Sequence, residues 1–129
     1  MKLLESAENY LETILVLCRD GNQVRSIDIV NALDFSKPSV SVAMRNLRES
    51  GYILTDDNGY ISLTESGRAI AETMLERHTW ISDWLIYLGV DRITAVSDAC
   101  KMEHAMSSQS FSAIKGHIRD WKRGIGQQR

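Results

Sequence analysis

Residues 36–63 read SKPSVSVAMRNLRESGYILTDDNGYISL and combine a capped helix with a β-hairpin. Ser36 is suited to cap the helix, and Pro38 falls in the first turn, where a missing N–H has no cost. Apolar residues then recur at helical spacing, at Val40, Ala43, Met44 and Leu47. Beyond this helix, Asn58-Gly59 lies between two apolar runs, which indicates a tight turn between two strands.

Two further helices are expected before this segment. Residues 5–19 carry apolar side chains at helical spacing, and Asp20-Gly21-Asn22 ends the pattern. Ser26 is expected to cap a short helix that runs to about Leu33. Helix, helix, turn, helix and hairpin is the order of a winged helix-turn-helix, whose last helix enters the major groove of DNA. We therefore expect a DNA-binding domain over residues 1–66.

The rest of the chain is predicted to be helical, which makes the fold class mainly α. Thr64 opens a long helix that runs on to Gly89, and further helices are expected from Asp91 or Ala95 to Met106 and from Ser108 to Ile118. We assign residues 67–129 to a helical dimerisation domain. The basic tail from Lys115 is expected to be a frayed, solubilising end, with phosphate contact as the alternative.

Composition excludes several classes of protein. The net charge of −2 excludes a general attraction to nucleic acid, so DNA binding must come from a local patch. No apolar run reaches the roughly 18 residues of a membrane span, and the N-terminus lacks the pattern of a signal peptide. We therefore expect a cytoplasmic protein without a membrane partner. In that reducing compartment Cys18 and Cys100 are expected to have separate roles, with a disulfide as the minority alternative.

The expected recognition helix has a cation-rich face. Between Ser36 and Arg48 there are three cations and no acid. Small polar side chains at its start allow close approach to bases and phosphates. The expected DNA-contacting residues are Ser36, Lys37, Pro38, Ser39, Ser41, Arg45 and Arg48. A solvated helix face remains the alternative, and the acidic tip of the hairpin, Asp56-Asp57, predicts a wing that grips phosphate weakly.

A metal-ligand triplet is present near the C-terminus. Cys100, Glu103 and His104 stand at i, i+3 and i+4, so all three side chains project from one face of a helix. Thiolate, carboxylate and imidazole together suit a divalent transition ion better than calcium or magnesium. The alternative is a half-buried helix face that carries a cysteine beside a surface Glu-His pair.

Further candidate ligands lie elsewhere in the chain. Asn9 and Glu12 are three residues apart and therefore share a helix face. His78 interrupts an apolar ladder on the long helix, where a histidine with satisfied hydrogen bonds is the more common case. His117 has no comparable neighbours in sequence, so we expect it on the surface.

Several segments together resemble a known family. They are SAENYLETI, SKPSVSVAMRNLRESGYI, YISLTESGRAIA, RHTWISDWLIYLGV and DACKMEHAMS. The chain resembles the diphtheria toxin repressor family of metal-dependent regulators, to about residue 118. Its length is similar to the manganese-transport regulator branch, which lacks the SH3-like third domain of the iron-regulator branch.

This resemblance implies a ligand set. By analogy, the ion is bound by Glu12, His78, Cys100, Glu103 and His104. Asn9 occupies a position where relatives use Asp or Met, and it offers a neutral carbonyl oxygen. Ser82 and Val96 replace a Glu and a His of the iron branch, so that branch's ancillary site is incomplete here. The resemblance leaves two alternatives for the number of ions, which are a single ion or a pair of ions bridged by Glu12 and Glu103.

The resemblance also implies the cofactor. Fe2+ or Mn2+ is expected, and Co2+, Zn2+ or Ni2+ can substitute. Cys100 matches the iron branch, whereas the manganese branch has a Glu there, and sulfur favours Fe2+, Co2+ or Zn2+ over Mn2+ unless availability in the cell decides.

The expected function is therefore that of a repressor, not an enzyme. The loaded protein would bind palindromic operator DNA as a homodimer, after the ion restricts a hinge around Gly67. The rival interpretations are a winged-helix regulator that senses a small organic ligand, a metal-dependent hydrolase with Glu103 as base, and an adaptor that does not bind DNA. The hydrolase lacks an HExxH motif and a phosphate-binding loop.

Overall fold

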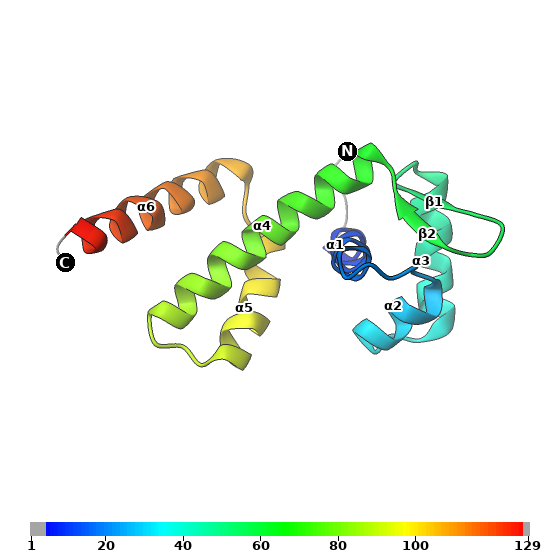
Figure 1. The fold of residues 1–129 in the computed structure, drawn as a ribbon, viewed down its shortest axis with the longest axis horizontal. Coiled ribbons are helices and arrows are strands. Elements are labelled where there is room, and N and C mark those ends of the chain that lie inside the picture. Colours follow the sequence, from blue (N-terminus) through cyan, green and yellow to red (C-terminus); the bar gives the residue numbers. More distant parts are fainter. Residues whose placement is uncertain (1–4, 128–129) are drawn as a thin grey trace. The chain divides into compact units, whose positions relative to one another are not determined.

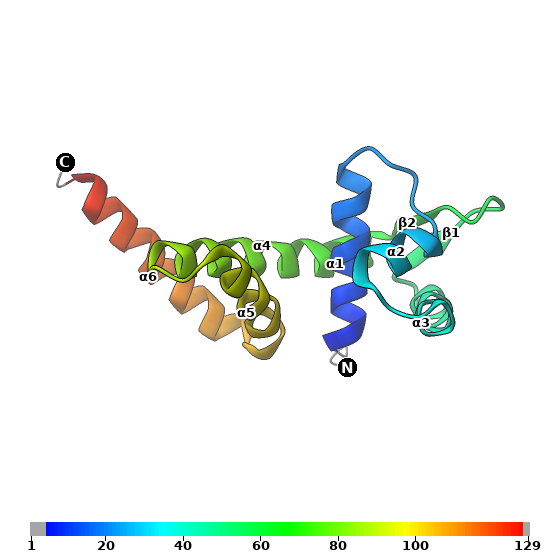
Figure 2. The ribbon, with the colours of Figure 1, turned by 90° about the horizontal axis from the view of Figure 1, so that it is seen from below.

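The structure is a computed structural model that describes residues 5–127, with side chains to residue 122. Contacts divide the chain into two compact units, Met1–Leu75 and Glu76–Arg129. The described residues form six helices and one hairpin, whose arrangement is drawn in Figures 1 and 2. The mainly α class expected from the sequence is confirmed.

The first unit is a winged helix-turn-helix. It contains α1 (Glu5–Arg19), α2 (Ser26–Leu33), α3 (Lys37–Glu49), β1 (Ile53–Thr55), β2 (Ile61–Leu63) and the first turns of α4 (Glu65–Tyr87). The first two helices have the expected bounds, and α3 begins directly after the expected cap, Ser36. Asp34, which ends α2, has a positive φ of 55°, and this left-handed residue makes the sharp turn into α3.

Helix α3 begins as its sequence predicts. The Ser36 hydroxyl accepts a hydrogen bond from the Ser39 N–H at 3.3 Å, and Pro38 lies in the first turn. The cap of α2 is different from the expected one, because Ser26 is the first helical residue and not the cap. There the Arg25 N–H donates to the Asp28 carboxylate at 2.8 Å, so the charged side chain three residues later satisfies the donor.

The hairpin is a two-stranded antiparallel sheet. Ile53 pairs with Leu63 and Thr55 pairs with Ile61, and Val24 adds an isolated bridge to Ile61. The bridge ties the segment before α2 to the base of the hairpin. One hydrophobic core joins these elements, and its buried members are Tyr10, Leu11, Ile14, Leu15, Val24, Ile29, Val40, Met44, Leu47, Ile53, Ile61 and Ala71.

Helix α4 begins inside this first unit. Thr64 caps it, since its hydroxyl accepts from the Gly67 N–H at 3.1 Å and donates to the Gly51 carbonyl at 2.8 Å. A Cβ atom on Gly67 would collide with the Tyr52 carbonyl oxygen. The close approach of the Tyr52 backbone therefore explains why residue 67 is a glycine, a position where we had expected a hinge. The domain boundary expected between residues 66 and 67 lies at the start of α4, whereas contacts with the core continue to Leu75.

The second unit consists of the remainder of α4, then α5 (Arg92–Ala105) and α6 (Ser108–Gln127). Gly89, with a φ of 103°, reverses the chain after α4, and α5 then runs back toward the middle of α4 (Figure 1). Asp91 caps α5, because its carboxylate accepts from the Thr94 N–H at 3.0 Å.

The frayed end expected from Lys115 is not present in the structure. Helix α6 continues to Gln127, nine residues beyond the expected end, while Arg129 lies outside the described residues. Phe111 and Ile118 are buried, and the ammonium groups of Lys115 and Lys122 each lie 5.5 Å from the Trp80 ring centre. These cation–π contacts give the basic residues a packing role.

No helix among the described residues is long and apolar enough to cross a membrane. Cys18 and Cys100 do not form a disulfide, so the minority alternative is wrong.

Candidate metal centre and nucleic-acid interface

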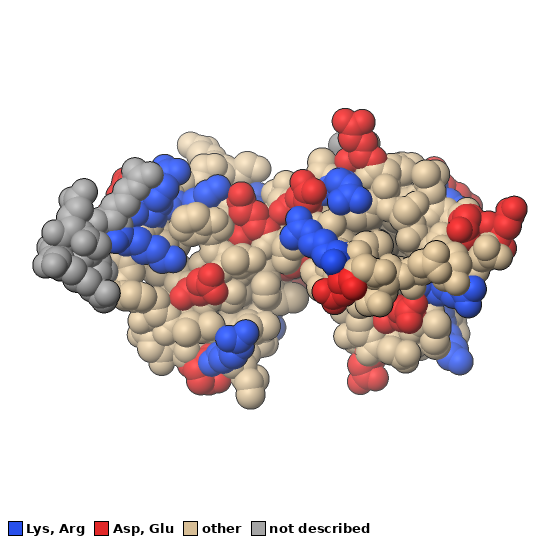
Figure 3. Space-filling model, in the orientation of Figure 1, with Lys and Arg blue, Asp and Glu red and all other residues tan. Residues whose placement is uncertain are grey.

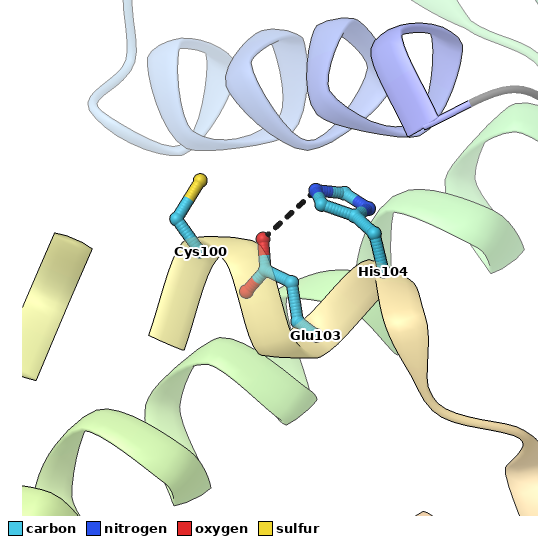
Figure 4. Close-up of side chains that lie close together, drawn as sticks. All are labelled: Cys100, Glu103 and His104. Atoms are coloured by element: carbon cyan, nitrogen blue, oxygen red, sulfur yellow. Dashed lines mark ion pairs between the residues drawn. The ribbon is translucent and has the colours of Figure 1, made fainter. Parts of the chain in front are cut away.

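A stripe of small residues leads along α5 to the metal triplet. Ala95, Ala99 and Glu103 are spaced four apart, and each is 0% exposed. Because residues four apart lie on one helix face, Glu103 continues the buried face that the two alanines begin. Cys100 and His104 flank it (Figure 4). One donor atom from each of these three residues lies within 4.8 Å of the others, as the i, i+3, i+4 spacing predicts.

The Glu103 carboxylate is buried without hydrogen bonds. His104 Nε2 lies 3.3 Å from Glu103 Oε1, and His78 Nδ1, from α4, lies 3.1 Å from Oε2. These are ion-pair distances, but neither carboxylate oxygen has a partner in hydrogen-bond geometry. Burying an ionised carboxylate in this way is costly unless a cation compensates for the lost water. The site therefore fits a bound metal ion.

The pKa of His78 also indicates that a positive charge is favoured beside Glu103. Its interaction with the Glu103 carboxylate raises the pKa of the imidazole above 6.5, and the charges of Glu103 and Asp83 add to this effect, while burial opposes it. Glu103 thus attracts a positive charge to this position. A proton on His78 and a divalent ion at Glu103 are two ways to supply that charge.

The donors together define the chemistry of the site. One thiol, one carboxylate and two imidazoles come from two helices of the same unit, which are α4 for His78 and α5 for Cys100, Glu103 and His104. Mixed sulfur, nitrogen and oxygen donors are typical of divalent transition ions. His78 Nδ1 is paired with the Glu103 carboxylate, and the role of His78 as a ligand stays a prediction.

The two remaining predicted ligands belong to the first unit. Glu12 is a buried residue of α1, 8% exposed, and Asn9 lies one turn earlier on the same helix and is half-buried. Their role as ligands stays a prediction.

The positions of the iron branch's ancillary site do not form a second cluster with the triplet. The Ser82 hydroxyl donates to the Thr79 carbonyl of its own helix at 3.3 Å, and the Val96 side chain is 39% exposed. His117 is exposed, as expected.

The seven predicted DNA-contacting residues all lie on the exposed side of α3 or at its cap. Val40, Met44 and Leu47 form the buried stripe of this helix. The seven predicted residues are all exposed, and they are Ser36, Lys37, Pro38, Ser39, Ser41, Arg45 and Arg48. The Ser36 hydroxyl also donates to Ser39 Oγ at 2.8 Å, so these two hydroxyls are partly engaged with each other. Whether the seven residues contact DNA stays a prediction.

The acidic tip of the hairpin has a structural cause. Asp56 Oδ1 accepts the N–H groups of Asn58 and Tyr60, each at 2.9 Å, and Gly59 has a φ of 83°. The carboxylate therefore closes the turn. Red side chains mark the end of the hairpin at the right edge of Figure 3, and elsewhere on that face both signs of charge are interspersed.

Two residues of interest were not predicted from the sequence. Val42 is 46% exposed on the polar side of α3, where an apolar residue can contact a thymine methyl group. Its place in the helical pattern could have shown this. Arg77 is 5% exposed, and its guanidinium contacts the end of α5. No local pattern marks that role, because the partners are backbone carbonyls about 26 residues away along the chain.

Both units match families of known proteins. Residues 2–60 match the family described as the iron dependent repressor, N-terminal DNA binding domain. Residues 64–123 match the iron dependent repressor, metal binding and dimerisation domain. The chain belongs to the iron-dependent repressor family. It therefore carries a DNA-binding domain and a metal-binding, dimerising domain, and its family consists of transcriptional repressors, not enzymes.

Individual relatives agree with this assignment. An uncharacterized HTH-type transcriptional regulator of Methanocaldococcus jannaschii is 30% identical over 92% of this chain and 96% of its own length. The transcriptional regulator MntR of Escherichia coli is 31% identical over 86% of this chain and 72% of its own. A solved manganese-dependent transcriptional repressor, in complex with manganese, superposes with a TM-score of 0.78 at 27% identity, over 87% of this chain and 52% of its own. This chain thus spans about half the length of that solved repressor.

Proposed function

We propose that this iron-dependent repressor homologue binds palindromic operator DNA as a homodimer when a divalent transition metal is bound around Glu103. The observation that carries the metal site is the fully buried Glu103 carboxylate, whose two oxygens lack hydrogen-bond partners beside His78 and His104. The bound ion supplies the positive charge that this carboxylate lacks. We place the protein in the cytoplasm, with its DNA.

His78, Cys100, Glu103 and His104 are the proposed ligands from the second unit. We include Glu12 and Asn9 from α1, because the resemblance to metal-dependent regulators assigns ligands to both positions. Glu12 supplies a carboxylate and Asn9 a neutral carbonyl oxygen. If Glu12 and Glu103 both bridge, the set accommodates two ions, and otherwise it holds one.

Fe2+ or Mn2+ is the proposed physiological ion. The family description names iron, and the solved relative holds manganese. The Cys100 thiolate favours Fe2+ over Mn2+ by its softness, and Co2+, Zn2+ and Ni2+ are expected to substitute in vitro. A small organic effector is not part of this proposal.

On the DNA side, the exposed face of α3 enters the major groove. Lys37, Arg45 and Arg48 contact phosphates, which supplies affinity without reading sequence. The small residues at the start of the helix allow its backbone to approach the bases. Two copies of α3 in a symmetric dimer then read two half-sites, so the operator is palindromic.

Metal binding and DNA binding are coupled in this proposal. If the ion raises operator affinity by a given factor, the operator must raise metal affinity by the same factor. This reciprocity gives two independent measurements of one quantity.

The experiment is an anaerobic titration of the full chain with Fe2+ and with Mn2+, followed by operator selection from random DNA with each ion and with chelator. We expect saturable metal uptake, and selection of a palindrome only when metal is present. His104→Ala should weaken metal binding and metal-dependent DNA binding by at least about 100-fold, since a ligand contributes more than the 10–100-fold typical of supporting residues. His117→Ala, an exposed histidine of α6, is the matched control and should change neither.

The DNA half is tested by salt dependence. Each of Lys37→Ala, Arg45→Ala and Arg48→Ala should lower the slope of log affinity against log salt by about 1. Lys101→Ala, an exposed cation of α5, should leave that slope unchanged. Equal metal binding by wild type and His104→Ala, or a palindrome selected with chelator present, would refute the proposal.

A further inference from the structure

A buried arginine holds the end of the helix that carries the triplet. Arg77 Nη1 donates to the Glu103 carbonyl at 2.9 Å and to the Met106 carbonyl at 2.7 Å, and Nη2 lies 3.4 Å from Ser108 Oγ. The guanidinium also lies 5.4 Å from the centre of the Phe111 ring. Its partners are thus carbonyl and hydroxyl oxygens and an aromatic face.

The end of α5 explains why these contacts form. The helix ends at Ala105, and Met106 has an extended backbone with φ −94° and ψ 145°. The last carbonyls of a helix have no partner within the helix, and together they carry a partial negative charge. Arg77 satisfies two such carbonyls and places its positive charge beside them.

The contact between Arg77 and the Glu103 carbonyl joins the parts of the backbone that carry two proposed ligands. Arg77 immediately precedes His78 on α4, and its first acceptor is the backbone carbonyl of Glu103 itself. The contact therefore links the backbone that carries one imidazole to the backbone that carries the carboxylate. It does so through the Glu103 carbonyl and leaves the carboxylate oxygens available to an ion.

We infer that Arg77 is a positioning residue for the metal centre, which fixes the last turn of α5 so that the Glu103 carboxylate lies beside both His78 and His104. This inference rests on the proposed metal site. Arginine suits the role better than lysine, because a planar guanidinium directs several N–H groups at once, whereas an ammonium is a point charge on a flexible stem. Arg77→Lys keeps the charge and loses the geometry.

The test uses Co2+ under anaerobic conditions, because its visible absorption reports both coordination geometry and thiolate ligation. Arg77→Lys is compared with Ile118→Val, which removes one buried methylene from α6 and leaves the end of α5 unaltered. We expect Arg77→Lys to weaken Co2+ binding about 10- to 100-fold, as for residues that orient ligands, and to shift the absorption bands. Ile118→Val should lower Tm and leave affinity and spectrum as in wild type.

Three results have distinct meanings. A wild-type affinity and spectrum in folded Arg77→Lys would overturn the inference while the metal site stands. An equal loss of affinity in Ile118→Val would reduce Arg77 to a structural residue and would also overturn it. Absence of Co2+ binding by the wild type would refute the proposed function itself.

If Arg77→Lys does not fold, the wild type still provides a test. We expect the guanidinium protons of Arg77 to exchange with solvent much more slowly than those of exposed Arg92, and to slow further when Zn2+ binds. Exchange of Arg77 at the rate of Arg92, or no change with Zn2+, would overturn the inference.

Discussion

His78 Nδ1 and Glu103 Oε2 lie 3.1 Å apart, although the two residues belong to different helices and are 25 positions apart in the chain. The carboxylate is fully buried and the imidazole side chain is only 24% exposed. The Glu103 carboxylate therefore places a negative charge at this point. The positive charge that balances it can come from a proton on His78 or from a divalent metal ion. The stability of the metal-free protein should therefore depend both on the Glu103 carboxylate and on the proton of His78.

Glu103→Gln is expected to stabilise the metal-free protein and to abolish its response to metal. The Glu103 carboxylate is fully buried and neither of its oxygens has a partner in hydrogen-bond geometry, so a neutral isostere should be more stable by about 1–3 kcal/mol. In wild type, metal at 100 times its Kd should add about 2.7 kcal/mol, and the variant should lose this increment. Thermal unfolding at pH 8.5, with and without Mn2+, measures both. Exposed Glu72→Gln should behave as wild type, and a metal-dependent rise in Tm for Glu103→Gln would contradict the prediction.

The stability of the metal-free protein should depend on pH through His78. The folded state raises the pKa of His78 above its ordinary value of 6.5, so the folded protein holds this proton more tightly than the unfolded chain does. The resulting stabilisation is complete below 6.5 and is lost as pH rises through the folded-state pKa. The Tm difference between wild type and His78→Gln should therefore shrink from pH 6 upward. Metal affinity should show the opposite trend, because protons compete for the same nitrogen. A Tm difference that grows with pH would rule this out.

Val42 is expected to read a thymine methyl group. It is 46% exposed and lies three residues before Arg45, so the two side chains are neighbours on the surface of α3. Replacing the contacted thymine by uracil removes one methyl group and should weaken wild-type binding roughly 4-fold, or about 0.8 kcal/mol. Val42→Ala should bind the two operators alike. Val16→Ala, at an exposed valine of α1, should retain the wild-type preference, and a uracil effect that persists in Val42→Ala would assign the contact to another residue.

Gly67→Ala is expected to destabilise the protein by about 1–3 kcal/mol, since the new Cβ meets the Tyr52 carbonyl and the backbone must shift. Gly116→Ala is the matched control. A Cβ there has no atom within 4 Å, so the change should stabilise α6 by about 0.5–1 kcal/mol through helix propensity. Chemical denaturation measures both. Equal stability of the two variants would contradict the explanation of Gly67 by the close approach of Tyr52.

The sequence predicted the elements whose signals are local. The start of α3 depends on Ser36 and Pro38, which lie within one turn, so this start was predicted from the sequence. The end of α6 was missed, because Lys115 and Lys122 are held by the Trp80 ring on another helix. Contacts of that kind have no signature in the local spacing of residues.

The residues of the candidate site also differ in whether a local sequence pattern predicts them. Cys100, Glu103 and His104 share one helix face by spacing alone, and the structure brings them together. His78 was a candidate from the sequence with a core histidine as the more common alternative, and the resemblance to a family then placed it in the ligand set. Arg77 was absent from the prediction, because its partners are carbonyls that every residue possesses.

Ala95 and Ala99 lie on the same buried face as Glu103, and their methyl groups set how deeply that face of α5 sits. A larger side chain at either position would displace α5 and lengthen the distance between Glu103 on this helix and His78 on α4. A wider site of that kind suits a larger ion with a greater share of oxygen ligands. The metal preference of this chain can therefore change through residues that never touch the metal, while every donor stays the same.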